Sequence, residues 1–252
     1  MKEKARKKYK PIYLLPSVFS LSNLFFGLLS IIMSIHGNFR WAAFWIIVAA
    51  VLDGFDGIIA RATRTHSEFG TELDSLADSI SFGAATSLLL YIWAFQPAGY
   101  AGIFFSFIYL AAGLLRLARY NVKTKALPDR RHYTGLTIPS AAMFMSSLVL
   151  FHPRPFLTRE SSFLLALLAL FISFCMISTI RYKNFLSFNP RHRIDLRSAL
   201  LWAVFLAGLI FYTKLFLIGF FSVNVLSGPA ETVFRYLKKQ LRKKSKREVI
   251  PS

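Results

Sequence analysis

The chain has 252 residues, of which 55% are hydrophobic, and it carries a formal net charge of +19. This apolar content excludes an ordinary soluble domain and is typical of a protein that crosses the membrane several times. A basic soluble protein would suggest nucleic-acid binding, but the basic residues here lie mainly between apolar segments, so no nucleic acid is expected as a partner.

Eight hydrophobic segments follow one another along the chain, each near the ~20 residues that cross the hydrocarbon core of a bilayer. They cover residues 14–36, 40–61, 71–94, 99–120, 134–151, 161–181, 197–213 and 215–234. The predicted fold class is therefore all-α, a polytopic membrane helix bundle with about eight transmembrane helices. The third segment is the least apolar at its start, and the eighth is interrupted by Asn224 and by Pro229.

The basic residues predict the topology. If both termini lie in the cytoplasm, 27 of the 31 Lys and Arg residues fall on the cytoplasmic side, as the positive-inside rule requires. We expect a multi-pass protein of the cytoplasmic membrane, whose basic tail is either a positive-inside anchor or a contact to anionic lipids. The expected units are a basic interfacial segment (1–13), a membrane core (14–185), an additional transmembrane hairpin (186–234) and a polybasic cytoplasmic tail (235–252).

Four of the six aspartates, Asp53, Asp56, Asp74 and Asp78, lie within 26 residues of otherwise apolar sequence. A charge at membrane depth costs at least ~2.5–3.5 kcal/mol, so such a cluster needs a compensating partner. Asp53 and Asp56 are three residues apart, and Asp74 and Asp78 are four apart, so each pair shares a helix face. Two antiparallel helices would bring the pairs together, and carboxylates so placed suit divalent cations near the cytoplasmic face.

Two residue types beside the aspartates allow more than one interpretation. Gly57 leaves room for a metal or substrate, but it also suits close packing of helices through small residues. Arg61 is either an anchor at the membrane edge or a bidentate clamp on a phosphate. The neighbouring carboxylates favour the clamp, because they indicate a metal-bound anionic substrate.

The spacing of these residues resembles the signature of the CDP-alcohol phosphotransferase family, and Asp53 is similar to a further aspartate of that family. The matching residues are Asp56, Gly57, Ala60, Arg61, Gly70, Asp74 and Asp78. The resemblance implies that Asp53, Asp56, Asp74 and Asp78 hold two divalent cations, Mg²⁺ or Mn²⁺, and that Asp78 is also the catalytic base. It further implies nucleotide and phosphate binding by Gly57, Ala60, Arg61 and Gly70, and a homodimer.

Further segments resemble the branch of this family that uses L-serine as acceptor, the phosphatidylserine synthases. They are residues 73–83, 115–121, 133–140 and 177–182. The implied reaction is attack of the L-serine hydroxyl on CDP-diacylglycerol, giving phosphatidylserine and CMP at the cytoplasmic side of the membrane. The candidates for binding the acceptor are Asn23, Arg116, Arg119, Asn121 and Tyr133, although Arg116 and Arg119 could equally be topology anchors.

Two alternatives remain at this point. A sister enzyme would use another acceptor, glycerol 3-phosphate or inositol phosphate, and the basic residues near the cytoplasmic edge do not exclude an anionic acceptor. A non-enzymatic divalent cation transporter would also carry intramembrane carboxylates. The transporter is disfavoured because the four aspartates lie near one membrane face, whereas an ion path needs polar residues along its length.

Overall fold

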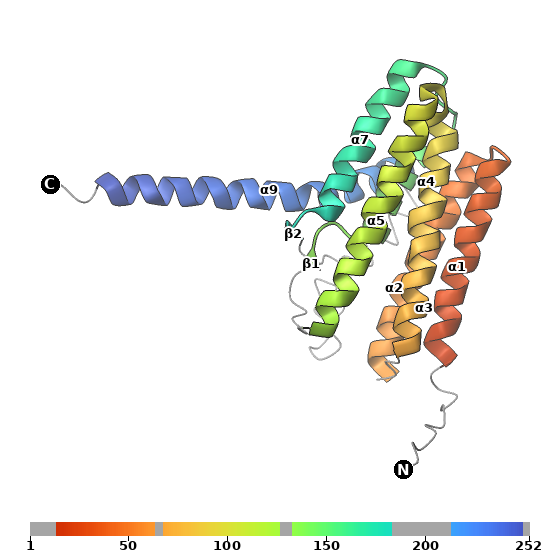
Figure 1. The fold of residues 1–252 in the computed structure, drawn as a ribbon, viewed down its shortest axis with the longest axis horizontal. Helices are drawn as coiled ribbons and strands as arrows, with labels where there is room; N and C mark the ends of the chain where they lie inside the picture. The colour runs from red at the N-terminus through yellow and green to blue at the C-terminus, as the bar shows by residue number, and fades with distance from the viewer. Residues whose placement is uncertain (1–13, 64–67, 127–132, 183–212, 249–252) are drawn as a thin grey trace, which may run out of the picture.

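The computed structural model describes residues 14–63, 68–126, 133–182 and 213–248, and within these residues the chain is almost entirely helical (Figure 1). The helices are α1 (Leu14–Ile35), α2 (Phe39–Thr63), α3 (Glu68–Asp78), η2 (Ser79–Ala84), α4 (Ala85–Leu90), η3 (Tyr91–Phe95), η4 (Gln96–Ala98), α5 (Tyr100–Ala126), α6 (Ile138–Phe151), α7 (Arg159–Ile177) and α9 (Thr213–Glu248). Two short strands, β1 (Tyr133–Thr134) and β2 (Arg181–Tyr182), pair in antiparallel fashion.

Five helical stretches among the described residues are long and apolar enough to cross a membrane. They are Ser17–Ile35, Phe69–Ala98, Tyr100–Val122, Arg159–Ile177 and Leu215–Thr232. α6 is apolar but shorter. The predicted all-α, multi-pass membrane class is thereby confirmed. The count of eight spans stays a prediction, because the seventh, 197–213, lies almost entirely outside the described residues.

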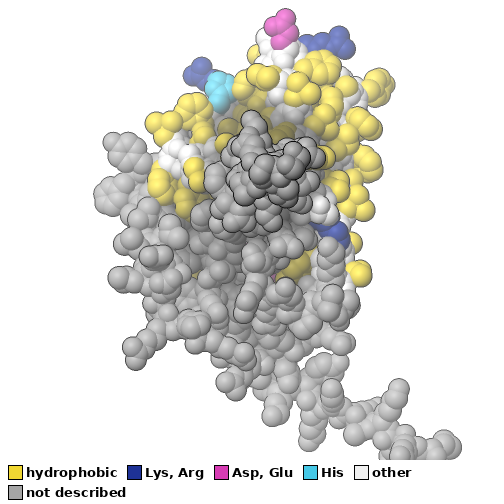
Figure 2. Space-filling model, turned by 90° about the vertical axis from the view of Figure 1, so that its left-hand side faces the viewer, with side chains coloured by type: hydrophobic (Ala, Val, Ile, Leu, Met, Phe, Trp, Pro, Cys, Tyr) yellow, Lys and Arg dark blue, Asp and Glu magenta, His cyan; other side chains and the backbone are white. Residues whose placement is uncertain are grey.

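The outward faces of the bundle are apolar. Val18 and Phe25 on α1, Phe104 on α5 and Leu164 on α7 are all exposed. Figure 2 shows hydrophobic side chains over much of the described part of one face, with charged groups gathered mainly at its upper end. Hydrocarbon chains would cover such a surface, since apolar patches of this extent are rare on proteins surrounded by water.

The first three helices stand upright beside one another (Figure 1). α1 packs along α2 and also contacts α3 and η2, so it is the shared neighbour of the two segments that carry the aspartates. On the other side of the bundle, α5 packs against α7. Large side chains such as Phe82, Trp93 and Tyr109 are fully buried between the helices. The aspartate-bearing helices are therefore held by a packed core.

The third predicted span is one helical path from Glu68 to Ala98, but it is not a regular α-helix throughout. A π-helical segment, η2, begins directly after Asp78, and a second one, η3, follows α4. π turns inside α-helices occur frequently at functional sites. The first of them separates the part of the path that carries the aspartates from the part that is buried in the bundle.

The fifth predicted span begins later than expected, at Ile138 instead of residue 134. Tyr133–Thr134 forms β1, and Gly135 then takes a φ of 81°, which favours glycine because other residues are strained there. Thr137 caps α6 by accepting a hydrogen bond from the backbone N–H of Ser140 at 3.4 Å. The cap and the turn fix the start of the helix, whereas hydropathy alone does not distinguish them from the helix itself.

The last helix, α9, lies across the direction of the bundle helices and extends well beyond them (Figure 1). Leu217, Phe221 and Val225 are buried, and the helix packs against α6. It passes through Pro229 and continues to Glu248, so most of the predicted polybasic tail is helical. The predicted hairpin 186–234 stays a prediction, because most of its first arm lies outside the described residues.

Candidate metal and active site

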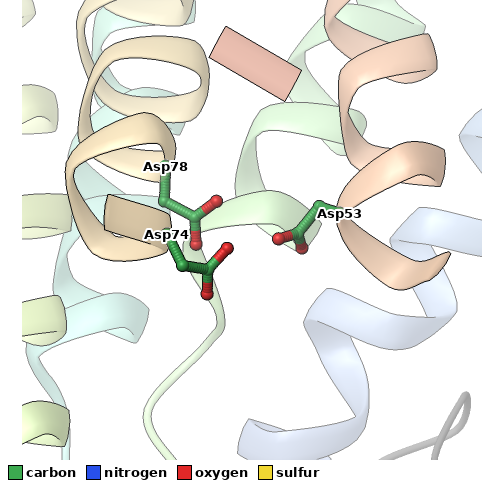
Figure 3. Close-up of side chains that lie close together, drawn as sticks. All are labelled: Asp53, Asp74 and Asp78. Atoms are coloured by element: carbon green, nitrogen blue, oxygen red, sulfur yellow. The ribbon is translucent and has the colours of Figure 1, made fainter. Parts of the chain in front are cut away.

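Three of the four predicted metal-binding carboxylates converge. Asp53 comes from α2, and Asp74 and Asp78 come from one face of α3. One carboxylate oxygen of each lies within 4.8 Å of the others. Figure 3 shows the three side chains pointing into the same space between the two helices. Asp78 is only 8% exposed, while Asp53 and Asp74 are half-buried.

Like charges dominate this cluster. The carboxylates of Asp74 and Asp78 act electrostatically on Asp53, and the positive charge of Arg116 opposes them. Arg116 is 6% exposed, and among the residues whose side chains are described it is the only buried cation. Its guanidinium carbon lies 5.4 Å from the centre of the Tyr120 ring, a cation–π contact. One cation against three carboxylates leaves a negative site.

The cluster fits a divalent cation. Mg²⁺ and Mn²⁺ prefer carboxylate oxygens, and these three oxygens are close enough to be ligands of one ion or of two neighbouring ions. Burial strengthens the case, since carboxylates that share a low-dielectric site repel one another strongly unless a cation offsets them. Asp53, Asp74 and Asp78 are therefore the described residues that would hold it.

Asn23 joins the cluster from α1. Its amide Nδ2 donates a hydrogen bond of 3.1 Å to Oδ1 of Asp78, and the whole side chain is buried. The structure thus brings one acceptor-binding candidate to the carboxylates themselves, and places a second, Arg116, within reach of their charge. Whether either residue binds the acceptor stays a prediction.

Two other acceptor-binding candidates contact neighbouring helices. Arg119 donates hydrogen bonds to the backbone carbonyls of Ile177 at 2.6 Å and Ser178 at 3.1 Å, at the end of α7. Asn121 donates through Nδ2 to Oγ of Ser75 at 2.9 Å, which ties the end of α5 to α3 beside Asp74. Both contacts join helices, and the acceptor role of these two residues stays a prediction.

The remaining predicted site residues are described only in part. Gly70 is half-buried in the first turn of α3. Five others have a described backbone, in α2 or β1, but their burial and contacts lie outside the described part of the structure: Asp56, Gly57, Ala60, Arg61 and Tyr133. Their expected roles as metal ligand, as nucleotide and phosphate contacts and as acceptor contact stay predictions.

Sequence reasoning missed two residues that hold α1 at the site. Ser81, in η2, donates a hydrogen bond of 3.0 Å to the backbone carbonyl of Asn23. Gly27, one turn after Asn23, approaches so closely that a Cβ there would stand 2.7 Å from Cα of Ser81. The available signal was the spacing of Asn23 and Gly27, a polar and a small residue on one face of an apolar helix.

Comparison with known proteins gives consistent matches. The family model described as CDP-alcohol phosphatidyltransferase matches residues 13–180. A CDP-diacylglycerol–serine O-phosphatidyltransferase of Helicobacter pylori is 37% identical over 176 residues, 69% of this chain and 74% of that protein. A protein of the same name from Bacillus subtilis is 32% identical over 171 residues, which are 68% of this chain and 90% of that protein. An archaetidylserine synthase of Methanothermobacter thermautotrophicus is 36% identical over 181 residues, which are 71% of this chain and 73% of that protein.

Proposed function

The chain belongs to the CDP-alcohol phosphatidyltransferase family, and from this premise we propose that it transfers the phosphatidyl group of CDP-diacylglycerol to the hydroxyl of L-serine. The products are phosphatidylserine and CMP. The observation that carries the proposal is the convergence of Asp53, Asp74 and Asp78 within 4.8 Å. The choice of serine is supported by relatives of at least 32% identity whose names specify that acceptor.

The carboxylate cluster is proposed to hold two divalent cations, Mg²⁺ or Mn²⁺, with Asp56 as the fourth ligand beside Asp53, Asp74 and Asp78. When bound, such cations would bind the diphosphate oxygens and stabilise the negative charge that develops on them. The three described carboxylates are the support for this assignment, because together with Arg116 they leave a buried negative charge.

Asp78 is proposed to be the catalytic base. A serine hydroxyl is a weak nucleophile at neutral pH and needs a base within hydrogen-bond reach. The carboxylate of Asp78 takes the hydroxyl proton while the serine oxygen forms a bond to the phosphorus that carries the diacylglycerol. The bond from that phosphorus to the bridging oxygen breaks, and CMP leaves with the electron pair.

The substrate contacts follow from the family signature and from the position of the site. We assign the nucleotide and its phosphates to Gly57, Ala60, Arg61 and Gly70. We assign the carboxylate of serine to Arg116, since it is a buried cation beside the cluster. The site is proposed to open to the cytoplasmic side of the cell membrane, the basic tail to contact anionic lipids, and the protein to act as a homodimer.

The test is CMP release by the purified protein in detergent, with CDP-diacylglycerol, Mn²⁺ and one acceptor at a time. We expect turnover with L-serine and none with glycerol 3-phosphate or inositol phosphate. Turnover with either of those and none with serine would refute the choice of acceptor. Because one relative is named archaetidylserine synthase, a donor that carries an archaetidyl group is the second donor to compare.

Two variants test the base. Asp78→Asn should reduce CMP release by at least about 10²-fold, since general-base catalysis contributes 10²–10⁴-fold. Glu72→Gln is the matched control, because Glu72 is an exposed acid on the same helix and lies outside the cluster. Turnover by Asp78→Asn within a few-fold of the native protein would remove Asp78 as the base.

A further inference from the structure

A hydrogen bond from α1 reaches the carboxylate of Asp78. Asn23 is fully buried, and its Nδ2 donates to Oδ1 of Asp78 at 3.1 Å. The chemistry fixes this orientation of the amide, because the reverse one would place the Asn23 oxygen against a carboxylate oxygen and the two would repel.

The hydrogen bond is held in place by the backbone around it. The hydroxyl of Ser81 donates to the backbone carbonyl of Asn23 at 3.0 Å. One turn further along α1, Gly27 lies against the backbone of Ser81 with no room for a side chain. Since η2 follows Asp78 directly, these contacts fix α1 against the residues immediately after the base.

Asp78 needs such a partner because of its other neighbours. Asp53 and Asp74 each present an oxygen within 4.8 Å of an oxygen of Asp78. Repulsion between carboxylates would turn the side chain of Asp78 about its χ angles, and a base that is displaced by 1 Å loses about 10²-fold in rate. A donor that cannot move counteracts this rotation.

We infer that Asn23 is a positioning residue for the base, which orients the carboxylate of Asp78 toward the acceptor hydroxyl. This inference rests on the proposed function. It gives Asn23 a different task from binding the acceptor, the role first predicted for it. The amide oxygen Oδ1 of Asn23 has no hydrogen-bond partner among the described residues, so contact with serine is the competing possibility that the experiment has to separate.

The experiment compares Asn23→Ala and the isosteric Asn23→Asp with the native protein in kcat, in KM for serine and in Mn²⁺ binding by electron paramagnetic resonance. Ser30→Ala is the matched control, because Ser30 is a fully buried polar residue further along α1. Thermal unfolding of each purified variant shows whether it is folded.

We expect Asn23→Ala to lose about 10- to 100-fold in kcat, with KM for serine and the Mn²⁺ affinity within about threefold of native values. Asn23→Asp should lose at least as much in kcat, because it keeps the shape but replaces the donor by a fourth carboxylate; the Mn²⁺ criterion therefore applies to Asn23→Ala alone. A raised KM for serine with a native kcat would instead assign Asn23 to acceptor binding and overturn the inference. Native values of both kcat and KM would also overturn it.

The two hypotheses fail in different ways. If the native protein releases no CMP with serine and CDP-diacylglycerol, the proposed function is wrong. If the native protein is active and folded Asn23 variants keep the native kcat, the proposed function stands and the positioning role is wrong. If Asn23→Ala does not fold, the isosteric Asn23→Asp decides, since it changes no volume.

Discussion

Replacing Gly27 by alanine should uncouple the base from α1, because the new Cβ would push against Ser81, whose Oγ is the atom nearest to it. The new Cβ would stand 2.7 Å from Cα and 2.8 Å from Cβ of Ser81, whereas ordinary van der Waals contact begins at 3.4 Å. The helices must therefore separate by about 0.7 Å. If Asn23 moves with its helix, its 3.1 Å hydrogen bond to Asp78 lengthens to about 3.8 Å, which is too long for a hydrogen bond.

The expected loss in kcat is about 10²-fold, from the misplacement of the base. The free energy of unfolding should fall by about 1–3 kcal/mol, because the site is overpacked. CMP release with L-serine gives kcat and KM, and thermal unfolding in the same detergent gives the change in stability. Gly219→Ala is the matched control, since a Cβ at that helical glycine would meet nothing within 4 Å.

A second variant sharpens this prediction. Gly27→Ala combined with Ser81→Ala should be no more active than Gly27→Ala alone, because Cα and Cβ of Ser81 would still be in contact with the new methyl group. A folded Gly27→Ala protein whose kcat lies within twofold of native would show that close packing of α1 does not hold the carboxylate. The reasoning from distance to rate would then be refuted.

Three further outcomes are expected. Asp74→Asn should raise the Mn²⁺ concentration needed for half-maximal CMP release by at least about tenfold, and an unchanged metal requirement would exclude Asp74 as a ligand. Arg119→Met should lower the free energy of unfolding by about 1.5–3 kcal/mol, because its hydrogen bonds to the end of α7 are lost. The KM for serine should change little, and a tenfold rise in that KM would support the acceptor role instead. Gly228→Ala should lower the free energy of unfolding by about 1–3 kcal/mol, since its Cβ would lie 2.8 Å from Cε2 of Tyr182. A midpoint of thermal unfolding equal to that of the native protein would show that α9 does not pack on β2.

The membrane class and the carboxylate cluster could be predicted because both depend on local patterns. A run of apolar residues determines whether a helix is buried in lipid, and a spacing of four residues puts Asp74 and Asp78 on one face of α3. Two antiparallel helices were expected to bring Asp53 to the same place, and the structure confirms that its carboxylate lies beside the other two.

The contacts of the basic and amide side chains could not be predicted, because they depend on where other helices end. Arg119 binds carbonyls that α7 leaves without helical partners at its C-terminus, and no sequence pattern near Arg119 indicates where that terminus lies. Asn121 contacts Ser75 across 46 residues of chain. The predicted start of α6 was wrong for a similar reason. β1, which precedes α6, pairs with β2, and β2 comes only after α7 in the sequence.

The π-helical segment η2 has a consequence for the face on which the carboxylates lie. Each α-helical residue turns the chain by about 100°, so the extra residue of a π turn changes the angular phase between the segments before and after it. If the same residues were wound as a regular α-helix, Asp74 and Asp78 would be rotated by about 100° away from α2 while Phe82 and Leu89 kept their places in the core. The wide turn is therefore what lets one helical path present its carboxylates to α2 and its large apolar side chains to the core.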